Sequence, residues 1–135
     1  MNVQHVPLEW VARVWPRVQG WLARAYAWSR GDYTVEQAQL LVASGQWILF
    51  VVTDAGGALR GAATVHMYNR PTARVAFVTG FGGSAVTTPA VLDQFRTLVR
   101  GLGATTLEAA ARPAMTRLLR RHGFDLKHHI VGAPL

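Results

Sequence analysis

The stretch ARVAFVTGFGGS, residues 73–84, decides how the chain is organised, because a β-prone run passes directly into a glycine cluster there. A helical pattern follows, with Thr88 suited to cap the helix and Pro89 suited to begin it. Apolar residues then recur at three- and four-residue steps as far as Leu102. The run ATTLEAA, residues 104–110, comes next. The order of a strand, a glycine-rich connection, a helix and a second strand predicts a parallel βαβ unit.

Three β-prone runs, the last of which is residues 73–79, predict an antiparallel meander. The run WILFVVT, residues 47–53, is continuously β-prone and does not alternate, as expected of a strand that is covered on both faces. The run over residues 59–68 alternates and therefore has two distinct faces. Turn sequences at residues 54–57 and 69–71 separate the three runs.

The N-terminal part predicts a short strand and two helices. Residues 2–6 alternate weakly, and an apolar stripe from Trp10 to Ala25 has helical spacing. Pro16 lies inside this stripe and is expected to kink or split the helix. Thr34 and Gln37 have the spacing of a capping box at the start of the second helix.

The C-terminal part predicts one more helix, from Pro113 to Gly123, and a final strand over residues 124–131. The predicted order is β–α–α–β–β–β–α–β–α–β. We therefore expect a single α/β (α+β) domain over residues 1–135, with a mixed, mostly antiparallel sheet of about six strands flanked by about four helices.

Composition narrows the classes of function and site. The chain has 135 residues, half of them hydrophobic, and no cysteine, which excludes disulfides, thiolate metal sites and a cysteine nucleophile. The N-terminus lacks the pattern of a signal peptide, and no apolar run approaches the roughly 20 residues of a membrane span. We expect a protein that is cytoplasmic when made and has no membrane partner.

The charge is strongly basic. Lys and Arg number 14 against 7 acidic residues, for a net charge of +7. This balance favours an acidic partner, such as a nucleotide phosphate, nucleic acid or an acidic protein surface. No nucleic-acid motif accompanies it, and the arginine content has an alternative origin in a GC-rich genome.

Two groups of side chains are candidates for contacts with a partner. Arg117, Arg120 and Arg121 cluster on the last predicted helix and could bind a phosphate or an acidic protein, although a solvated helix face has the same pattern. Trp10 and Trp28 could belong to an exposed aromatic patch, and core packing is the alternative.

The element order resembles that of the GNAT N-acetyltransferases along nearly the whole chain. The segment AMTRLLRRHGF, residues 114–124, looks like the last helix of that family, which typically closes with a Gly-Phe pair. Residues 15–46 resemble small GNAT-like proteins encoded in tailed-phage genomes. In the family, a glycine-rich connection between strand and helix cradles the coenzyme A pyrophosphate through backbone N–H groups. The residues implied here are Val78, Thr79, Gly80, Gly82, Gly83 and Ser84.

The sequence departs from the family where the chemistry is done. The phosphate pattern lacks its leading Gln or Arg, and the third strand of the meander carries no acid that could serve as a base. Leu119 occupies the position of the proton-donating tyrosine. His66, Tyr68 and Glu108 are weak substitutes, with ordinary amphipathic positions and an arginine-paired acid as the alternatives.

No metal site is predicted, because the spacing of the C-terminal histidines matches no known ligand set. Two functions remain open. The first is a virion structural or assembly protein of a tailed phage, which acts through contacts with other subunits or with copies of itself and requires no cofactor. The alternative is an acetyl-CoA-dependent N-acetyltransferase that acts on a small amine or a protein N-terminus.

Overall fold

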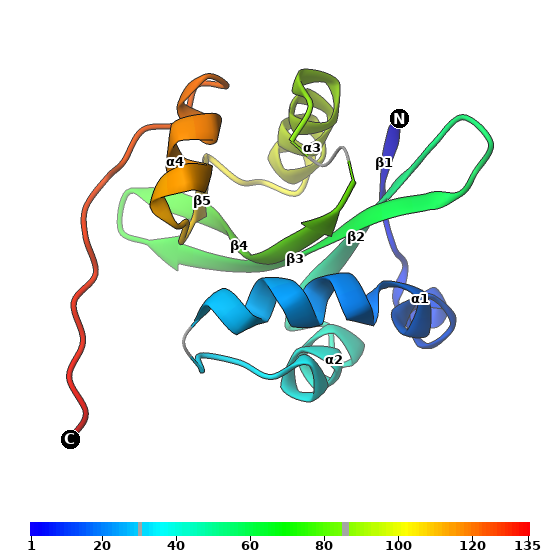
Figure 1. Ribbon diagram of the computed structural model, residues 1–135, viewed down its shortest axis with the longest axis horizontal. Helices are drawn as coiled ribbons and strands as arrows, with labels where there is room; N and C mark the ends of the chain where they lie inside the picture. Colours follow the sequence, from blue (N-terminus) through cyan, green and yellow to red (C-terminus); the bar gives the residue numbers. More distant parts are fainter. Residues whose placement is uncertain (30, 85–86) are drawn as a thin grey trace.

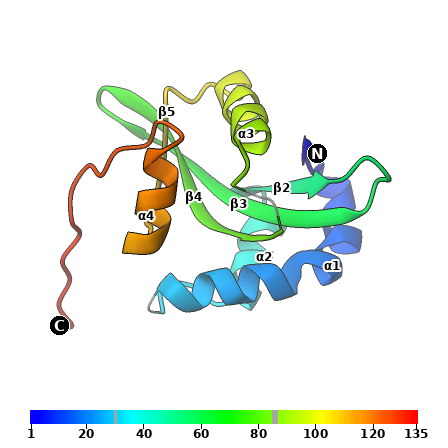
Figure 2. The ribbon, with the colours of Figure 1, turned by 45° about the horizontal axis from the view of Figure 1, so that its top comes forward.

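A five-stranded sheet runs through the middle of the protein, with helices on both of its faces (Figure 1). The computed structural model describes residues 1–29, 31–84 and 87–135. Helices α1 and α2 cover one face of the sheet, and helices α3 and α4 lie on the other (Figures 1 and 2). The elements in chain order are β1 (Asn2–His5), α1 (Leu8–Tyr26), a short 3₁₀ turn η1 (Ala27–Ser29), α2 (Val35–Ala43), β2 (Trp47–Thr53), β3 (Leu59–Arg70), β4 (Ala73–Gly83), α3 (Pro89–Gly101), β5 (Thr106–Ala109) and α4 (Pro113–Arg120).

The strands lie in the sheet in their chain order, β1-β2-β3-β4-β5. The first three pairings are antiparallel, and β5 joins β4 in parallel. The predicted meander and the predicted βαβ unit are therefore both confirmed, as is a mixed, mostly antiparallel sheet with four helices.

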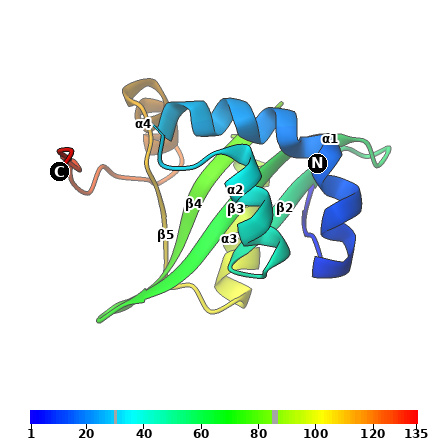
Figure 3. The same ribbon diagram turned by 90° about the horizontal axis from the view of Figure 1, so that it is seen from below.

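Helix α1 is continuous over 19 residues although Pro16 lies inside it. Its direction changes sharply between the N-terminal and C-terminal parts (Figures 1 and 3). Proline removes one backbone hydrogen bond and crowds the preceding turn, so a kink is the expected result. The helix bends but does not split, and one face stays buried along its whole length. The buried residues are Val11, Trp15, Val18, Leu22 and Tyr26.

Helix α2 begins at the predicted capping box. The Gln37 backbone N–H donates to Thr34 Oγ1 at 3.1 Å, and the Thr34 N–H donates to Gln37 Oε1 at 3.0 Å. These two bonds satisfy donors that the first turn of a helix otherwise leaves unpaired.

The core has two parts, one on each face of the sheet. Alternating residues of the central strands separate them, because successive side chains point to opposite faces. The α1/α2 face buries Trp15, Leu22, Tyr26, Trp47, Leu49 and Val51, among others. The α3 face buries Phe50, Val52, Val65, Ala76, Phe95 and Val99, among others.

The glycine cluster is a strand and not the predicted loop. Strand β4 continues to Gly83, and Gly80 and Gly82 pair with Thr64 and Ala62 of β3. The reason is the approach of α1: a Cβ at Gly80 would lie 2.5 Å from a ring carbon of Tyr26, and one at Gly82 would lie 2.8 Å from a backbone oxygen of α1. Glycine at these positions lets the helix rest on the bare strand backbone.

The predicted sixth strand, residues 124–131, does not form. Residues 124–135 contain neither helix nor strand, and this C-terminal tail extends away from the domain (Figures 1 and 2). Side chains attach its first part: Phe124 packs against Arg96, and Lys127 Nζ lies 2.8 Å from Glu108 Oε2. These contacts replace the backbone pairing that the alternating sequence predicted.

No helix of the described residues is both long enough and apolar enough to cross a membrane.

Candidate functional site

Strands β4 and β5 separate partway along their length, which opens the sheet. They pair only from Val75–Thr106 to Val78–Ala109. Beyond that point β4 stays with β3, whereas the chain after Ala109 leaves for α4 (Figure 1). Every residue from Phe77 to Gly82 is only half-buried, although β4 lies between two other strands. The splay therefore gives a ligand access to β4 from the side where β5 ends.

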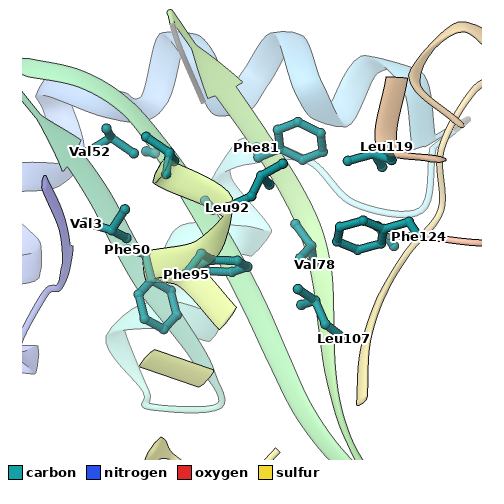
Figure 4. A pocket seen from close by; sticks show the side chains of 14 residues that line it. Val3, Phe50, Val52, Val78, Phe81, Leu92, Phe95, Leu107, Leu119 and Phe124 are labelled. Carbon is teal, nitrogen blue, oxygen red and sulfur yellow. The ribbon is translucent and has the colours of Figure 1, made fainter. Parts of the chain in front are cut away.

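An apolar cavity of about 60 Å³ lies beside the splay, on the α3/α4 face of the sheet. Side chains from both sides of the opening surround it (Figure 4), including Val78 and Phe81 of β4, Leu92 of α3, Leu119 of α4, and Phe124 of the tail. All of its lining residues are hydrophobic. Such a lining suits an aliphatic part of a ligand and disfavours a charged one.

Strand β4 carries a bulge next to the last residue that pairs with β5. Thr64 pairs with Gly80 and Val65 pairs with Val78, so Thr79 is an extra residue without a partner in the register. A bulge disrupts the ladder locally and re-aims the backbone groups around it. No strand of the described residues pairs with the β5 side of β4 from Thr79 to Gly83. This edge could therefore hydrogen-bond an extended, amide-containing ligand.

A chain of hydroxyl groups holds the bulge from the α1 side. Thr79 Oγ1 donates to the Thr64 carbonyl oxygen at 3.1 Å, and the two threonine hydroxyls lie 2.7 Å apart. Tyr26 Oη lies 2.6 Å from Thr64 Oγ1. Since Thr79 has already donated its only hydroxyl proton, Thr64 must donate to Thr79, and Tyr26 must donate to Thr64. Burial raises the pKa of Tyr26 to about 12, which keeps the tyrosine protonated and able to donate.

The residues expected to cradle a phosphate occupy different environments. Val78 lines the cavity, Thr79 is the bulge, and Gly80 and Gly82 lie under α1. Gly83 and Ser84 come nearest to the expected place, at the end of β4 before α3. Gly83 has φ +113°, and the Ser84 N–H donates to the Arg60 carbonyl at 2.8 Å.

Thr88 begins α3 as predicted. Its hydroxyl accepts a hydrogen bond from the Val91 N–H at 3.4 Å, and Pro89 is the first helical residue. A helix N-terminus favours a negatively charged group. Gly83, Ser84 and the first turn of α3 are therefore the described residues of the cleft that could hold a phosphate.

The expected catalytic substitutes lie on the α1 face of the sheet. Glu108 is bound by both terminal nitrogens of Arg70, at 2.5 and 2.8 Å, and by Lys127 at 2.8 Å. These partners, with the hydrogen bonds from Arg70 as the largest effect, lower the Glu108 pKa to about 2. The carboxylate is thus an ion-pair partner, as the alternative interpretation predicted, and it is poorly suited to accept a substrate proton.

His66 and Tyr68 share a face of β3, as predicted, with ring centroids 5.4 Å apart. The Tyr68 hydroxyl accepts a hydrogen bond from Arg70 at 2.7 Å, whereas His66 is exposed. Leu119 is buried in the cavity, where it supplies no proton. No group of histidine and acidic residues in the described parts of the chain could hold a metal ion.

The expected partner contacts are exposed but do not form one patch. Trp10 is 48% exposed near the start of α1, and Trp28 is 67% exposed after its end. The length of α1 separates the two tryptophans. Arg117 and Arg120 on α4, and Arg121 just after it, are exposed as predicted.

Sequence reasoning missed three residues: Tyr26 and Thr64, which hold the bulge, and Arg112, which lies over the ring of Trp28. Thr64 offered a signal, because it is a polar residue on the buried face of a central strand. Tyr26 continues the apolar stripe of α1 by one further turn. Nothing in the sequence indicated the contact of Arg112, because its guanidinium lies over the ring of Trp28, which is far away in the sequence.

The sequence matches no protein-family model and no curated protein. Solved structures, in contrast, match over essentially the whole chain. A probable acetyltransferase has a TM-score of 0.70 at 10% identity, with 100% of this chain and 97% of that chain covered. An aminoglycoside 6′-N-acetyltransferase from Acinetobacter baumannii has a TM-score of 0.66 at 10% identity, with 99% and 97% covered.

A third similar structure is a predicted acetyltransferase with acetyl-CoA from Clostridium acetobutylicum. Its TM-score is 0.64 at 9% identity, with 98% of this chain and 95% of that chain covered. At such low identities the similarity concerns the path of the backbone and carries no residue roles. The chain therefore has the fold of the GNAT acetyltransferases.

Proposed function

We propose that the protein is an acetyl-CoA-dependent N-acetyltransferase that acts on an amine. The observation that carries this proposal is the splay of β4 and β5 beside the bulge at Thr79, with an apolar cavity along it. The open backbone edge offers hydrogen bonds to the amide groups of the pantetheine arm, and the cavity offers an apolar wall. The start of α3 offers the phosphates a helix N-terminus.

The bulge is the place for the thioester in this arrangement. Backbone N–H groups aimed at a carbonyl oxygen stabilise the negative charge that develops when an amine attacks. The hydroxyl chain from Tyr26 fixes the backbone there before the ligand arrives, so little reorganisation is needed during the reaction.

The proposed chemistry needs no proton donor from the protein. The amine nitrogen forms a bond to the acyl carbon, the C–S bond breaks, and coenzyme A leaves as a thiolate. A thiol has a pKa of about 8.5, so its thiolate is an adequate leaving group and does not have to be protonated as it leaves. The amine loses its proton to water, and positioning provides the acceleration. The presence of Leu119 where the family has a proton donor is consistent with this route.

Calorimetric titration with acetyl-CoA tests the proposal, with two matched substitutions. Ala110 is exposed directly after β5, where the splay opens, so Ala110→Phe should block the cleft and abolish binding. Ala43→Phe, on the exposed end of α2 and on the other face of the sheet, should bind as the native chain does. The native chain should also melt at a higher temperature when acetyl-CoA is present.

Absence of binding by the native chain at millimolar acetyl-CoA would rule out the acetyltransferase. Equal binding by both variants would rule out the splay as its site. The first result would favour a second candidate function, a virion structural or assembly protein of a tailed phage. Exposed apolar side chains of the tail, Leu126, Ile130 and Val131, support this candidate, because they offer a contact surface for another subunit.

A further inference from the structure

An arginine lies over an exposed tryptophan between the end of α1 and the start of α4. The Arg112 Cζ is 4.5 Å from the centroid of the Trp28 ring. Trp28 belongs to the turn η1, and Arg112 immediately precedes α4. The end of α1 and the start of α4 lie next to each other in two perpendicular views (Figures 1 and 3), in agreement with this contact.

The guanidinium of Arg112 donates no hydrogen bond to any residue that the structure describes. Among the described residues, Arg60, Arg70 and Arg96 each lie within 4 Å of a carboxylate, whereas Arg112 has no acidic partner within that distance. No other group of the described chain accepts a hydrogen bond from its guanidinium. A guanidinium over an aromatic ring is held in place, yet its N–H donors can still bind a carboxylate through two parallel bonds.

Short stretches of chain connect the pair to the bulge where we place the thioester. Trp28 comes two residues after Tyr26, whose hydroxyl is linked through Thr64 to Thr79. Arg112 comes three residues after Ala109, which pairs with Val78 beside Thr79. Two or three residues span at most about 7 to 10 Å. These short connections link the pair to the residues that hold the bulge and to the strand pairing beside it.

We propose that Arg112, held by Trp28, binds a carboxylate of the acceptor, so the acceptor class is an amine that also carries a carboxylate, such as an amino acid. This inference rests on the proposed acetyltransferase activity. The net charge of +7 supports it, because a basic protein attracts an anionic molecule. In this role Arg112 would orient the acceptor without touching the reacting atoms, so it is a positioning residue.

The test compares two product analogues that differ only in charge, N-acetylphenylalanine and N-acetylphenylalaninamide. Binding to the native chain is measured by calorimetry and thermal shift. The carboxylate form should bind more tightly, and Arg112→Gln should weaken its binding about tenfold while leaving the amide form unchanged. Arg117→Gln, which removes an equal charge from an exposed position on α4, should retain the preference. Trp28→Leu should weaken it.

Acetyl-CoA turnover supplies a second readout. The ratio of kcat/KM for phenylalanine to that for phenylalaninamide should fall about tenfold in Arg112→Gln, through KM and not through kcat. A merely structural role would instead lower acetyl-CoA binding and both acceptors alike, and that result overturns the inference.

The outcomes for this inference and for the proposed function differ. Acetyl-CoA binding without a preference for the carboxylate form overturns only the role of Arg112. Preference for the carboxylate without any acetyl-CoA binding overturns the acetyltransferase and, with it, the assignment of Arg112 to an acceptor.

Discussion

At the scale of single residues, Tyr26 connects the packing of α1 to the candidate site. Its ring covers Gly80, and its hydroxyl starts the chain of hydrogen bonds to the bulge. It is 3% exposed, so the hydroxyl cannot exchange its protein partner for water. Tyr26 therefore contributes both to stability and to the shape of β4.

Alkaline pH should reveal this role. Burial raises the folded-state pKa of Tyr26 to about 12, above an unfolded value of about 10. The stabilisation is complete below pH 10 and is lost as the pH rises from 10 through 12, by roughly 2 to 3 kcal/mol. Urea denaturation at pH 9 and pH 11.5 measures this loss. Tyr26→Phe should be less stable by about 1 kcal/mol at pH 9 but should lose less on going to pH 11.5.

Tyr68→Phe is the control for this comparison, because Tyr68 lies on the same sheet face but outside the hydroxyl chain. Its loss of stability at alkaline pH should match that of the native chain. An identical loss in Tyr26→Phe would show that the Tyr26 hydroxyl is not selectively held in the folded state.

At the scale of elements, the contact between α1 and β4 depends on glycine. Gly80→Ala should destabilise the protein by about 1 to 3 kcal/mol, because the new Cβ would collide with the buried Tyr26 ring. Gly20→Ala in α1 is the matched control: nothing lies within 4 Å of its added Cβ, so it should stabilise the helix by about 0.5 to 1 kcal/mol. Thermal denaturation followed by circular dichroism measures both variants. Equal effects would mean that helix and strand do not meet as closely as described.

Local signals were sufficient to predict most of the elements. The capping box at Thr34 and Gln37, the kink at Pro16 and the Thr88–Pro89 helix start depend on neighbours in sequence, so they could be read directly. The extent of β4 could not, because glycine fits a loop as well as a strand. The decision between them depends on Tyr26, more than fifty residues earlier.

The candidate site was predictable only in outline. The element order predicts a cleft beside β4. Which side chains contact one another there depends on the register between β3 and β4. The bulge makes Thr79 an extra residue in β4, and its hydroxyl contacts Thr64 through that shift. Alternation of side chains in a strand does not show where a bulge will fall. Arg112 and Trp28 could not be paired from the sequence either, because they are far apart in the chain and meet only through the fold.

At the scale of the whole molecule, one cluster of charges ties the tail to the domain. Glu108 joins Arg70 of β3 to Lys127 of the tail. Without Glu108 the tail loses an attachment, so Glu108→Gln should increase tryptic cleavage after Lys127 severalfold. Mass spectrometry of timed digests at neutral pH measures the rate. Asp125→Asn changes an exposed acid of the tail that has no ion-pair partner among the described residues, and it should be cleaved at the native rate.

The same attachment has a defined acid limit. Because the Glu108 pKa is lowered to about 2, its contribution is complete above the ordinary carboxyl pKa and is lost progressively as the pH falls from there through 2, so part of it remains at pH 3. Pepsin digestion at pH 3 should therefore still distinguish the native chain from Glu108→Gln. Equal digestion at that pH would contradict the ion pair.

The contact of α1 with bare strand backbone also limits how this protein can evolve. Gly80 and Gly82 have no side chain, and α1 already fills the space beside them. A mutation at either position therefore destabilises the protein and does not change which ligand the cleft accepts. Inherited change in what the cleft accepts has to arise elsewhere. The turn η1 and the residues just before α4 are the stretches free to vary, because none of their side chains is buried in the core. Selection can therefore change these exposed stretches while the contact between α1 and β4 stays constant.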